Sequence, residues 1–332
     1  MSRSVSVELG INGAFLTRRW EEPDNWMRLT REVGFRNHSF CGDVLDPFFS
    51  GDHRFQLEVA GQVKAASHRH GVRITDVYTG VATHRFHGLS HSHFPPRKRM
   101  REWIEQAMTL AVAMGTDCLG GHWDAFSIET MSTEEGYEAA WARLVETFRE
   151  LAVVARDKGM HALYQEQMYI PSEVPWTLAQ GERFLIEVNR SNAGAAPVYL
   201  TLDVGHQAGM HYGLTGPDLD YLEWIKRFGA FSEVIHLQQT TPEASHHWPF
   251  TDQGNERGHV EMQKVLDTLV ASHEAAENSP ITEALAPADR CWLVLEAIPG
   301  STKNEETLLE ELKISAEYLH RFVPEGGMVF EA

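Results

Sequence analysis

The sequence predicts an α/β protein in which residues 1–332 form one domain, built as a closed (β/α)8 barrel. Short β-like runs alternate with longer amphipathic helical runs along the chain, which is typical of a parallel sheet covered by helices. No low-complexity linker divides the chain, and barrels of this length commonly fold as one domain. A doubly wound open sheet is the alternative, but no GxGxxG or phosphate-loop turn supports it.

Eight runs have the composition of strands, and we expect a helix after each one. The runs are 5–11, 35–41, 73–80, 116–123, 161–168, 198–205, 233–240 and 290–298. Apolar residues recur at intervals of three and four in the helical candidates, which are 99–114, 134–158, 178–189, 219–228, 260–275 and 305–322. The residues 241–258 are expected to be irregular.

The expected helix ends carry chemical signals. A Ser or Thr three residues before a Glu or Gln can cap a helix start reciprocally. Three such pairs are Ser132 with Glu135, Thr177 with Gln180, and Thr302 with Glu305. Gly115 and Gly159 follow helical runs, where a left-handed residue commonly ends a helix.

Composition limits the classes of partner. The net charge of −18 and the pI of about 5.4 argue against a general nucleic-acid or membrane binder. The N-terminal residues lack the apolar core of a signal peptide, and no apolar run approaches the roughly 18 residues of a spanning helix. Three scattered cysteines favour reduced thiols and a cytoplasmic location, and we expect no catalytic role for them. The sequence leaves open a homo-oligomer.

Polar residues end the last five expected strands. Parallel strands of a barrel end at one face, so these side chains should meet there. In chain order they are His122, Glu166, Asp203 with the nearby His206, His236 and Glu296.

Glu166, Asp203, His236 and Glu296 together form a set of three carboxylates and one imidazole. Such a set suits one divalent ion that prefers oxygen, namely Mn²⁺, Mg²⁺ or Co²⁺. A single carboxylate at a strand end is usually a helix cap, and a single strand histidine is usually packed in the core. Four such residues on four consecutive strands favour a metal site, because the carboxylates would repel one another without a cation.

These residues give the chain a resemblance to the sugar isomerase/epimerase superfamily with a xylose-isomerase-like TIM barrel. The resemblance covers nearly the whole strand–helix order. It is sharpest at Glu166, at the stretch Asp203-Val204-Gly205-His206, at His236 and at Glu296. The segments QEQMYIPSEVPWT (165–177) and VIHLQQT (234–240) are similar to the tetrulose-4-phosphate racemases, which are 3-epimerases of erythritol degradation.

The resemblance implies roles for the individual residues. Glu166, Asp203, His236 and Glu296 would bind one divalent ion, and the two glutamates would also act as acid and base. His206 would contact a substrate oxygen. His122 is a candidate substrate contact, with a supporting or packing role as the alternative.

The expected reaction is inversion of a carbon beside a ketone through an enediolate, with a glutamate on each face of the substrate. The expected substrate is a small sugar or sugar phosphate, in particular a tetrulose phosphate inverted at carbon 3. A 1,2-aldose–ketose isomerase and a non-catalytic sugar-binding barrel remain alternatives. A barrel endonuclease is disfavoured by the net charge and by Gln239, because some relatives carry HxxD where this chain has His236-Leu-Gln-Gln239.

Several further segments are candidates for the substrate pocket. The histidine-rich residues 84–93 could form a lid or an ordinary solvated loop. A substrate phosphate would need a basic partner, and the candidates are Arg18, Arg19, Arg85 and Lys303. Trp20, Trp26 and Trp248 could line a sugar pocket or pack in the core.

Overall fold

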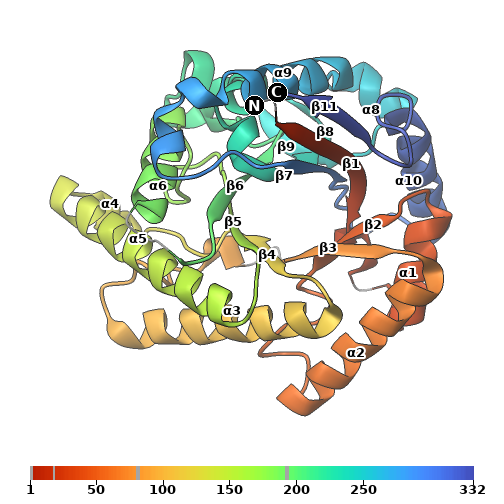
Figure 1. The fold of residues 1–332 in the computed structure, drawn as a ribbon, viewed down its shortest axis with the longest axis horizontal. Helices are drawn as coiled ribbons and strands as arrows, with labels where there is room; N and C mark the ends of the chain where they lie inside the picture. Colours follow the sequence, from red (N-terminus) through yellow and green to blue (C-terminus); the bar gives the residue numbers. More distant parts are fainter. Residues whose placement is uncertain (1–2, 18, 80–82, 191–193) are drawn as a thin grey trace.

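Eight parallel strands form a closed barrel with helices around it (Figure 1). The structure is a computed structural model that describes residues 3–17, 19–79, 83–190 and 194–332. The barrel strands are β1 (Ser4–Asn12), β2 (Asn37–Cys41), β3 (Arg73–Tyr78), β4 (Cys118–Gly121), β5 (Ala162–Glu166), β6 (Val198–Asp203), β7 (Ser232–Leu237) and β10 (Arg290–Leu295). The expected fold class and all eight expected strands are confirmed.

The barrel closes between its first and last strands. Ser6 lies opposite Arg290 and Ile11 lies opposite Leu295, so β1 and β10 run parallel in continuous register. A short strand that was not expected, β11 (Met328–Glu331), pairs antiparallel with the start of β1. Closure brings the carboxyl ends of all eight strands to one mouth of the barrel.

The outer ring contains helices that follow the strands in order (Figure 1). They are α1 (Pro23–Glu32), α2 (His53–His70), α3 (Phe94–Met114), α5 (Glu134–Asp157), α6 (Leu178–Asn189), α7 (Tyr221–Phe228), α9 (Met262–Glu274) and α10 (Glu305–Leu319). The last six match the expected helical runs. The ranges of α1 and α2 were not identified from the pattern, although the rule of one helix per strand requires them. None of the helices in the described part of the chain combines the length and the apolar content needed to cross a bilayer.

Two of the three expected helix caps lie at a different residue. Thr133, not Ser132, caps α5 by accepting a hydrogen bond from the Gly136 amide, and Asn304, not Thr302, caps α10. Thr177 caps α6 as expected. A shift of one or two residues leaves the pattern of apolar positions in a helix unchanged, which is why the period alone did not fix the cap.

Residues 241–258 are more regular than expected. Beyond β7 the chain forms a hairpin from β8 (Gln239–Thr241) and β9 (Ala244–Trp248), followed by the short helix α8 (Asp252–Arg257). The hairpin therefore follows directly after the strand that carries His236. Its position brings a second segment of chain to the mouth of the barrel.

Candidate functional site

A cavity of about 470 Å³ lies at the mouth where the strands end. Its lining comes from most of the strands and from the loops that follow them. The charged and polar lining residues include Asn12, Tyr78, His84, Arg85, His122, Glu166, Tyr169, His206, Ser245, His247 and Glu296. Four of the residues expected at the site, Glu166, Glu296, His206 and His122, line this cavity.

The four expected metal ligands lie together in the structure. Each of Glu166, Asp203, His236 and Glu296 offers one ligand atom, and these atoms all lie within 4.8 Å of one another. The strand register explains the arrangement, because Asp203 lies opposite His236 across β6 and β7. All four residues are buried, and Asp203 and His236 are the most deeply buried of them.

The imidazole of His236 faces the three carboxylates through its Nδ1 atom. That atom lies 3.1 Å from Oε1 of Glu166, 3.3 Å from Oε2 of Glu296 and 3.8 Å from Oδ2 of Asp203. The Tyr78 ring packs against the imidazole with a centroid distance of 4.5 Å. One nitrogen and oxygens of three carboxylates therefore converge on a single point.

The two oxygens of Asp203 have different surroundings. Oδ1 accepts hydrogen bonds from the Gly205 amide at 2.6 Å and from the Gln238 side chain at 2.8 Å. Oδ2 is buried and has no hydrogen-bond partner among the described residues. Leaving a buried carboxylate oxygen without a partner is costly. A cation at this position would satisfy it, so the donor set fits a divalent metal.

Gly205 makes the support of Asp203 possible. A Cβ atom at this position would lie 2.4 to 2.7 Å from atoms of the Gln238 side chain. Only glycine at position 205 leaves room for the Gln238 side chain to hydrogen-bond Oδ1 of Asp203. Packing against Gln238 thus explains why the Asp203-Val204-Gly205-His206 stretch has a glycine at its third position.

Burial and the neighbouring imidazoles act in opposite directions on the carboxyl groups of the cluster. Burial raises the pKa of the Asp203 carboxyl. Burial acts in the same direction on Glu166 and Glu296, but the adjacent His206 and His236 imidazoles outweigh it and hold the pKa of each glutamate below its ordinary value. Those carboxylates in turn raise the pKa of His236 despite its burial. The acids stay ionised only where positive charge is close.

His206 lies beside the cluster with one nitrogen fixed. Its Nδ1 pairs with the Gln167 carbonyl at 2.9 Å, and this atom is 3.8 Å from Oε1 of Glu166. Its Nε2 is 3.8 Å from Oδ2 of Asp203. The imidazole is therefore held at the edge of the cavity, close to the ligand atoms.

A backbone carbonyl fixes the orientation of the His122 ring. Its Nδ1 pairs with the Glu166 carbonyl at 3.0 Å, while its buried Nε2 has no hydrogen-bond partner among the described residues. Burial lowers the pKa of His122, so the ring is neutral near pH 7. A neutral imidazole with one fixed nitrogen and one free nitrogen in a cavity can bind a substrate hydroxyl.

The basic residues proposed as phosphate ligands differ in whether they line the cavity. Arg85 is the only Arg or Lys among the described residues that line the cavity. Arg19 instead pairs with Glu305 at 2.5 Å and donates to the Lys303 carbonyl, and the Lys303 ammonium pairs with Glu311. Arg18 lies outside the described residues.

The histidine-rich segment 84–93 forms part of the cavity wall. Buried Asp124 accepts hydrogen bonds from the amides of Gly88 at 2.8 Å and Ser90 at 3.1 Å, which anchors the middle of the segment. His84 reaches the cavity and pairs with buried Glu173 at 2.9 Å. The anchoring does not support a lid formed by the whole segment.

The three candidate tryptophans do not line the cavity. Trp26 is buried and packs against Phe40. Trp20 packs against Phe15. Trp248 stacks on His246 with a centroid distance of 4.0 Å.

Several residues that line the cavity were not expected from the sequence, and two of them, Asn12 and His247, lie against Glu296. Asn12 ends β1 and donates a hydrogen bond to Oε1 of Glu296 at 3.2 Å. His247, on the β8–β9 hairpin, places its Nδ1 3.4 Å from Oε2 of Glu296. Asn12 could have been found by applying the strand-end rule to the first strand, whereas no pattern in the sequence points to His247.

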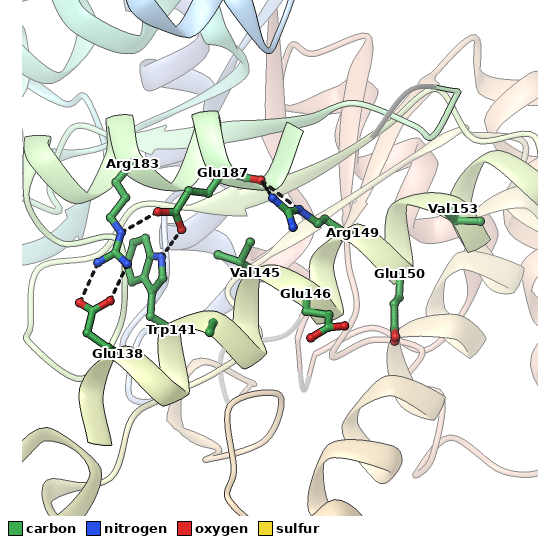
Figure 2. Close-up of a pocket in the computed structure, with 10 residues that line it drawn as sticks. Glu138, Trp141, Val145, Glu146, Arg149, Glu150, Val153, Arg183 and Glu187 are labelled. Carbon is green, nitrogen blue, oxygen red and sulfur yellow. Dashed lines mark hydrogen bonds and ion pairs between the residues drawn. The ribbon is translucent and has the colours of Figure 1, made fainter. Parts of the chain in front are cut away.

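A second hollow, of about 600 Å³, lies on the outer surface at helices α5 and α6 (Figure 2). Its wall is held by Arg183, which pairs with Glu138 and Glu187 and covers the Trp141 ring. None of its lining residues comes from the strand ends. It is a groove between helices and is separate from the cavity at the barrel mouth.

Comparisons with known proteins agree with this architecture. Residues 27–274 match the family described as Xylose isomerase-like TIM barrel. D-erythrulose 1-phosphate 3-epimerase of Brucella abortus (strain 2308) is 22% identical over 320 residues, which cover 93% of this chain and 100% of that protein.

Solved structures show the same fold. A candidate xylose isomerase from Rhodospirillum rubrum has a TM-score of 0.80 at 22% identity, with 96% of this chain and 100% of that chain covered. D-psicose 3-epimerase from Clostridium cellulolyticum H10 has a TM-score of 0.64 at 17% identity, with 95% and 98% covered. With the family match extending over most of its length, the chain belongs to the xylose isomerase-like TIM barrels.

Proposed function

We propose that this protein is a metal-dependent 3-epimerase of a small ketose or ketose phosphate, with residues 1–332 acting as one catalytic unit. The observation that carries the proposal is the pair Glu166 and Glu296, two buried glutamates that line one cavity and belong to the same cluster of ligand atoms. A module that only binds sugar would not need two ionised carboxylates at this position.

A divalent ion held by Glu166, Asp203, His236 and Glu296 would stabilise the negative charge that forms on a substrate oxygen when a neighbouring carbon loses its proton. Mn²⁺, Mg²⁺ and Co²⁺ all accept such a donor set. The bound ion would also offset the repulsion among the three carboxylates.

The two glutamates perform the proton transfer in this proposal. One removes the proton from the carbon beside the ketone, and the other returns a proton to the opposite face, which inverts that carbon. Their placement on β5 and directly after β10 allows them to approach a substrate from different strands of the barrel. His206 and His122 bind substrate oxygens and fix which carbon lies between the glutamates.

We further propose that the substrate carries a phosphate, which Arg85 binds. Arg85 lines the cavity and pairs with no carboxylate in the described part of the chain. An arginine can hold a phosphate through two hydrogen bonds. The relative from Brucella abortus is named for a phosphorylated tetrulose, which supports a tetrulose phosphate as the first substrate to test.

The test is proton NMR of the protein with Mn²⁺ or Mg²⁺ in D₂O. D-erythrulose 1-phosphate, its unphosphorylated ketose and D-tagatose are supplied separately. We expect deuterium at carbon 3 in the NMR spectrum, fastest with the phosphorylated tetrulose. The two carbon-3 epimers of a tetrulose are enantiomers with identical NMR spectra, so its inversion is followed by the change in optical rotation. Formation of an aldose instead would favour a 1,2-isomerase, and no exchange with any ketose would refute the epimerase.

The phosphate site has its own test. Arg85→Gln should raise KM for the phosphorylated ketose by about 10- to 100-fold, because it removes a charge-assisted contact, and should leave the unphosphorylated ketose nearly unaffected. Arg227→Gln is the matched control, since Arg227 is exposed on α7 away from the cavity. An equal loss with both ketoses would contradict a phosphate contact.

A further inference from the structure

His247 has an unusual backbone conformation. Its φ is +51°, and it is the only residue other than glycine with a positive φ in the described ranges. A side chain in this region costs free energy, and such positions persist where the surrounding structure holds them and cluster at active sites and ligand contacts. Glycine or asparagine would adopt this backbone more easily.

The surrounding hydrogen bonds hold His247 in place. Its backbone amide donates to Oε1 of Gln238 at 2.6 Å, and its Nε2 pairs with the Ser245 hydroxyl at 3.2 Å. The amide nitrogen of Gln238 donates to Oδ1 of Asp203 at 2.8 Å. One buried glutamine thus connects the position of His247 to a residue of the metal cluster.

The imidazole of His247 points into the cavity. Its Nδ1 is buried, lies 3.4 Å from Oε2 of Glu296, and has no hydrogen-bond partner among the described residues. The rings of His247 and His206 approach edge to face, with centroids 6.1 Å apart. An imidazole thus lies beside each glutamate, because Nδ1 of His206 is 3.8 Å from Oε1 of Glu166 and Nδ1 of His247 is 3.4 Å from Oε2 of Glu296.

The neighbouring histidine shows what a structural role on this hairpin looks like. His246 stacks its ring on Trp248 and pairs with the Thr241 hydroxyl at 3.1 Å. It does not line the cavity. The ring stacking and the hydrogen bond of His246 are made within the hairpin, whereas His247 lines the cavity.

We propose that His247 is a substrate-binding residue whose Nδ1 side hydrogen-bonds a sugar oxygen beside Glu296, as the counterpart of His206 beside Glu166. The inference rests on the proposed function for the identity of the ligand. Each glutamate would then have an imidazole next to it that holds a neighbouring substrate oxygen. In this proposal the positive φ of His247 serves to direct its ring into the cavity.

The test compares His247→Gly, His247→Asn and the control His246→Ala in the Mn²⁺-loaded protein. Glycine relieves the backbone strain and removes the ring, so we expect an unchanged or higher melting temperature with unchanged metal content. We also expect at least about tenfold weaker binding of D-erythrulose 1-phosphate by calorimetry. Asparagine should retain part of the affinity, and His246→Ala should bind like the wild type.

The outcomes separate this inference from the proposed function. A wild-type protein that binds the sugar without inverting it would refute the epimerase, and weaker binding by His247→Gly would still support the contact. A lower melting temperature with unchanged affinity in His247→Gly would show that His247 is structural. Equal losses in His247→Gly and His246→Ala would also overturn the inference, and a wild-type protein that binds no ketose would overturn both.

Discussion

At the scale of single residues, Asp203 shows how the chain builds a site that could hold a metal ion. One of its oxygens is held by two hydrogen-bond donors, and the other is buried without a partner in the described structure. The hydrogen bonds to the first oxygen fix the side chain, and the second oxygen lies where a cation could bind. Gly205 is required for this arrangement because Gln238 occupies the space of its missing side chain.

Replacing this aspartate should weaken metal binding. Asp203→Asn keeps the size of the side chain but removes its charge, so we expect Mn²⁺ affinity to fall by at least about tenfold. Titration calorimetry measures the affinity, and the rise in melting temperature on adding Mn²⁺ should shrink in parallel. Asp267→Asn, on the exposed face of α9, is the control. Equal Mn²⁺ affinity in Asp203→Asn and the wild type would rule out Asp203 as a ligand.

The sequence identifies residues of this kind only where a regular element positions them. Glu166, Asp203, His236 and Glu296 lie at strand ends, so the barrel geometry predicts that they meet. His247 depends on a hairpin and on a left-handed backbone conformation that no periodic pattern encodes. The hydrogen bonds from Gln238 and Ser245 create that conformation, and they become visible only in three dimensions.

At the scale of elements, the strands were easier to predict than the helices around them. Buried parallel strands are short apolar runs and stand out in the sequence. In α2 only five positions of eighteen are buried, so its apolar stripe is weak. The hairpin was read as irregular because its strands are short, and the turn between them contains Pro242 rather than an Asn-Gly or Asp-Gly pair.

The corrected cap of α5 can be tested with neighbouring residues. Thr133→Ala removes the hydroxyl that accepts from the Gly136 amide, and we expect it to lower the free energy of unfolding by about 1 kcal/mol. Ser132→Ala is the matched control, because the Ser132 hydroxyl donates instead to the Glu129 carbonyl in the preceding turn. Urea unfolding measures both. A larger loss in Ser132→Ala would restore the cap expected from the sequence.

At the scale of the whole molecule, barrel closure explains why residues more than 100 positions apart form one site. The register between β1 and β10 brings Asn12 to Glu296, and the order of the strands places Glu166 and Glu296 at one mouth on strands separated by β6 and β7. A sequence that predicts the barrel therefore predicts which residues meet. It does not predict the side-chain contacts beneath them, because those depend on local packing.

The stability of the whole fold should depend on pH through His38. Burial lowers the pKa of this fully buried imidazole from 6.5 to about 3. The unfolded chain binds this proton below about pH 6.5 and the folded chain does not, so stability is present above that pH and is lost as the pH falls toward 3.

His38 should therefore contribute about 2 kcal/mol to the fall in unfolding free energy between pH 7 and pH 5. Urea unfolding of the metal-free protein at both values measures the fall. His38→Leu cannot titrate, so its fall should be smaller than that of the wild type by this amount. An equal fall in both proteins would show that His38 does not carry the dependence.

The most direct test of the two-base mechanism is deuterium exchange by Glu166→Gln and Glu296→Gln, measured separately from each epimer of the ketose. Each variant, with metal content verified, should invert the substrate about 10²- to 10⁴-fold more slowly, because one general base is lost. The remaining glutamate can still remove a proton and return it to the same face. Each variant should therefore exchange deuterium into one epimer without converting it, and the two variants should act on opposite epimers. Metal-loaded variants that both interconvert the epimers at nearly the wild-type rate would contradict the mechanism.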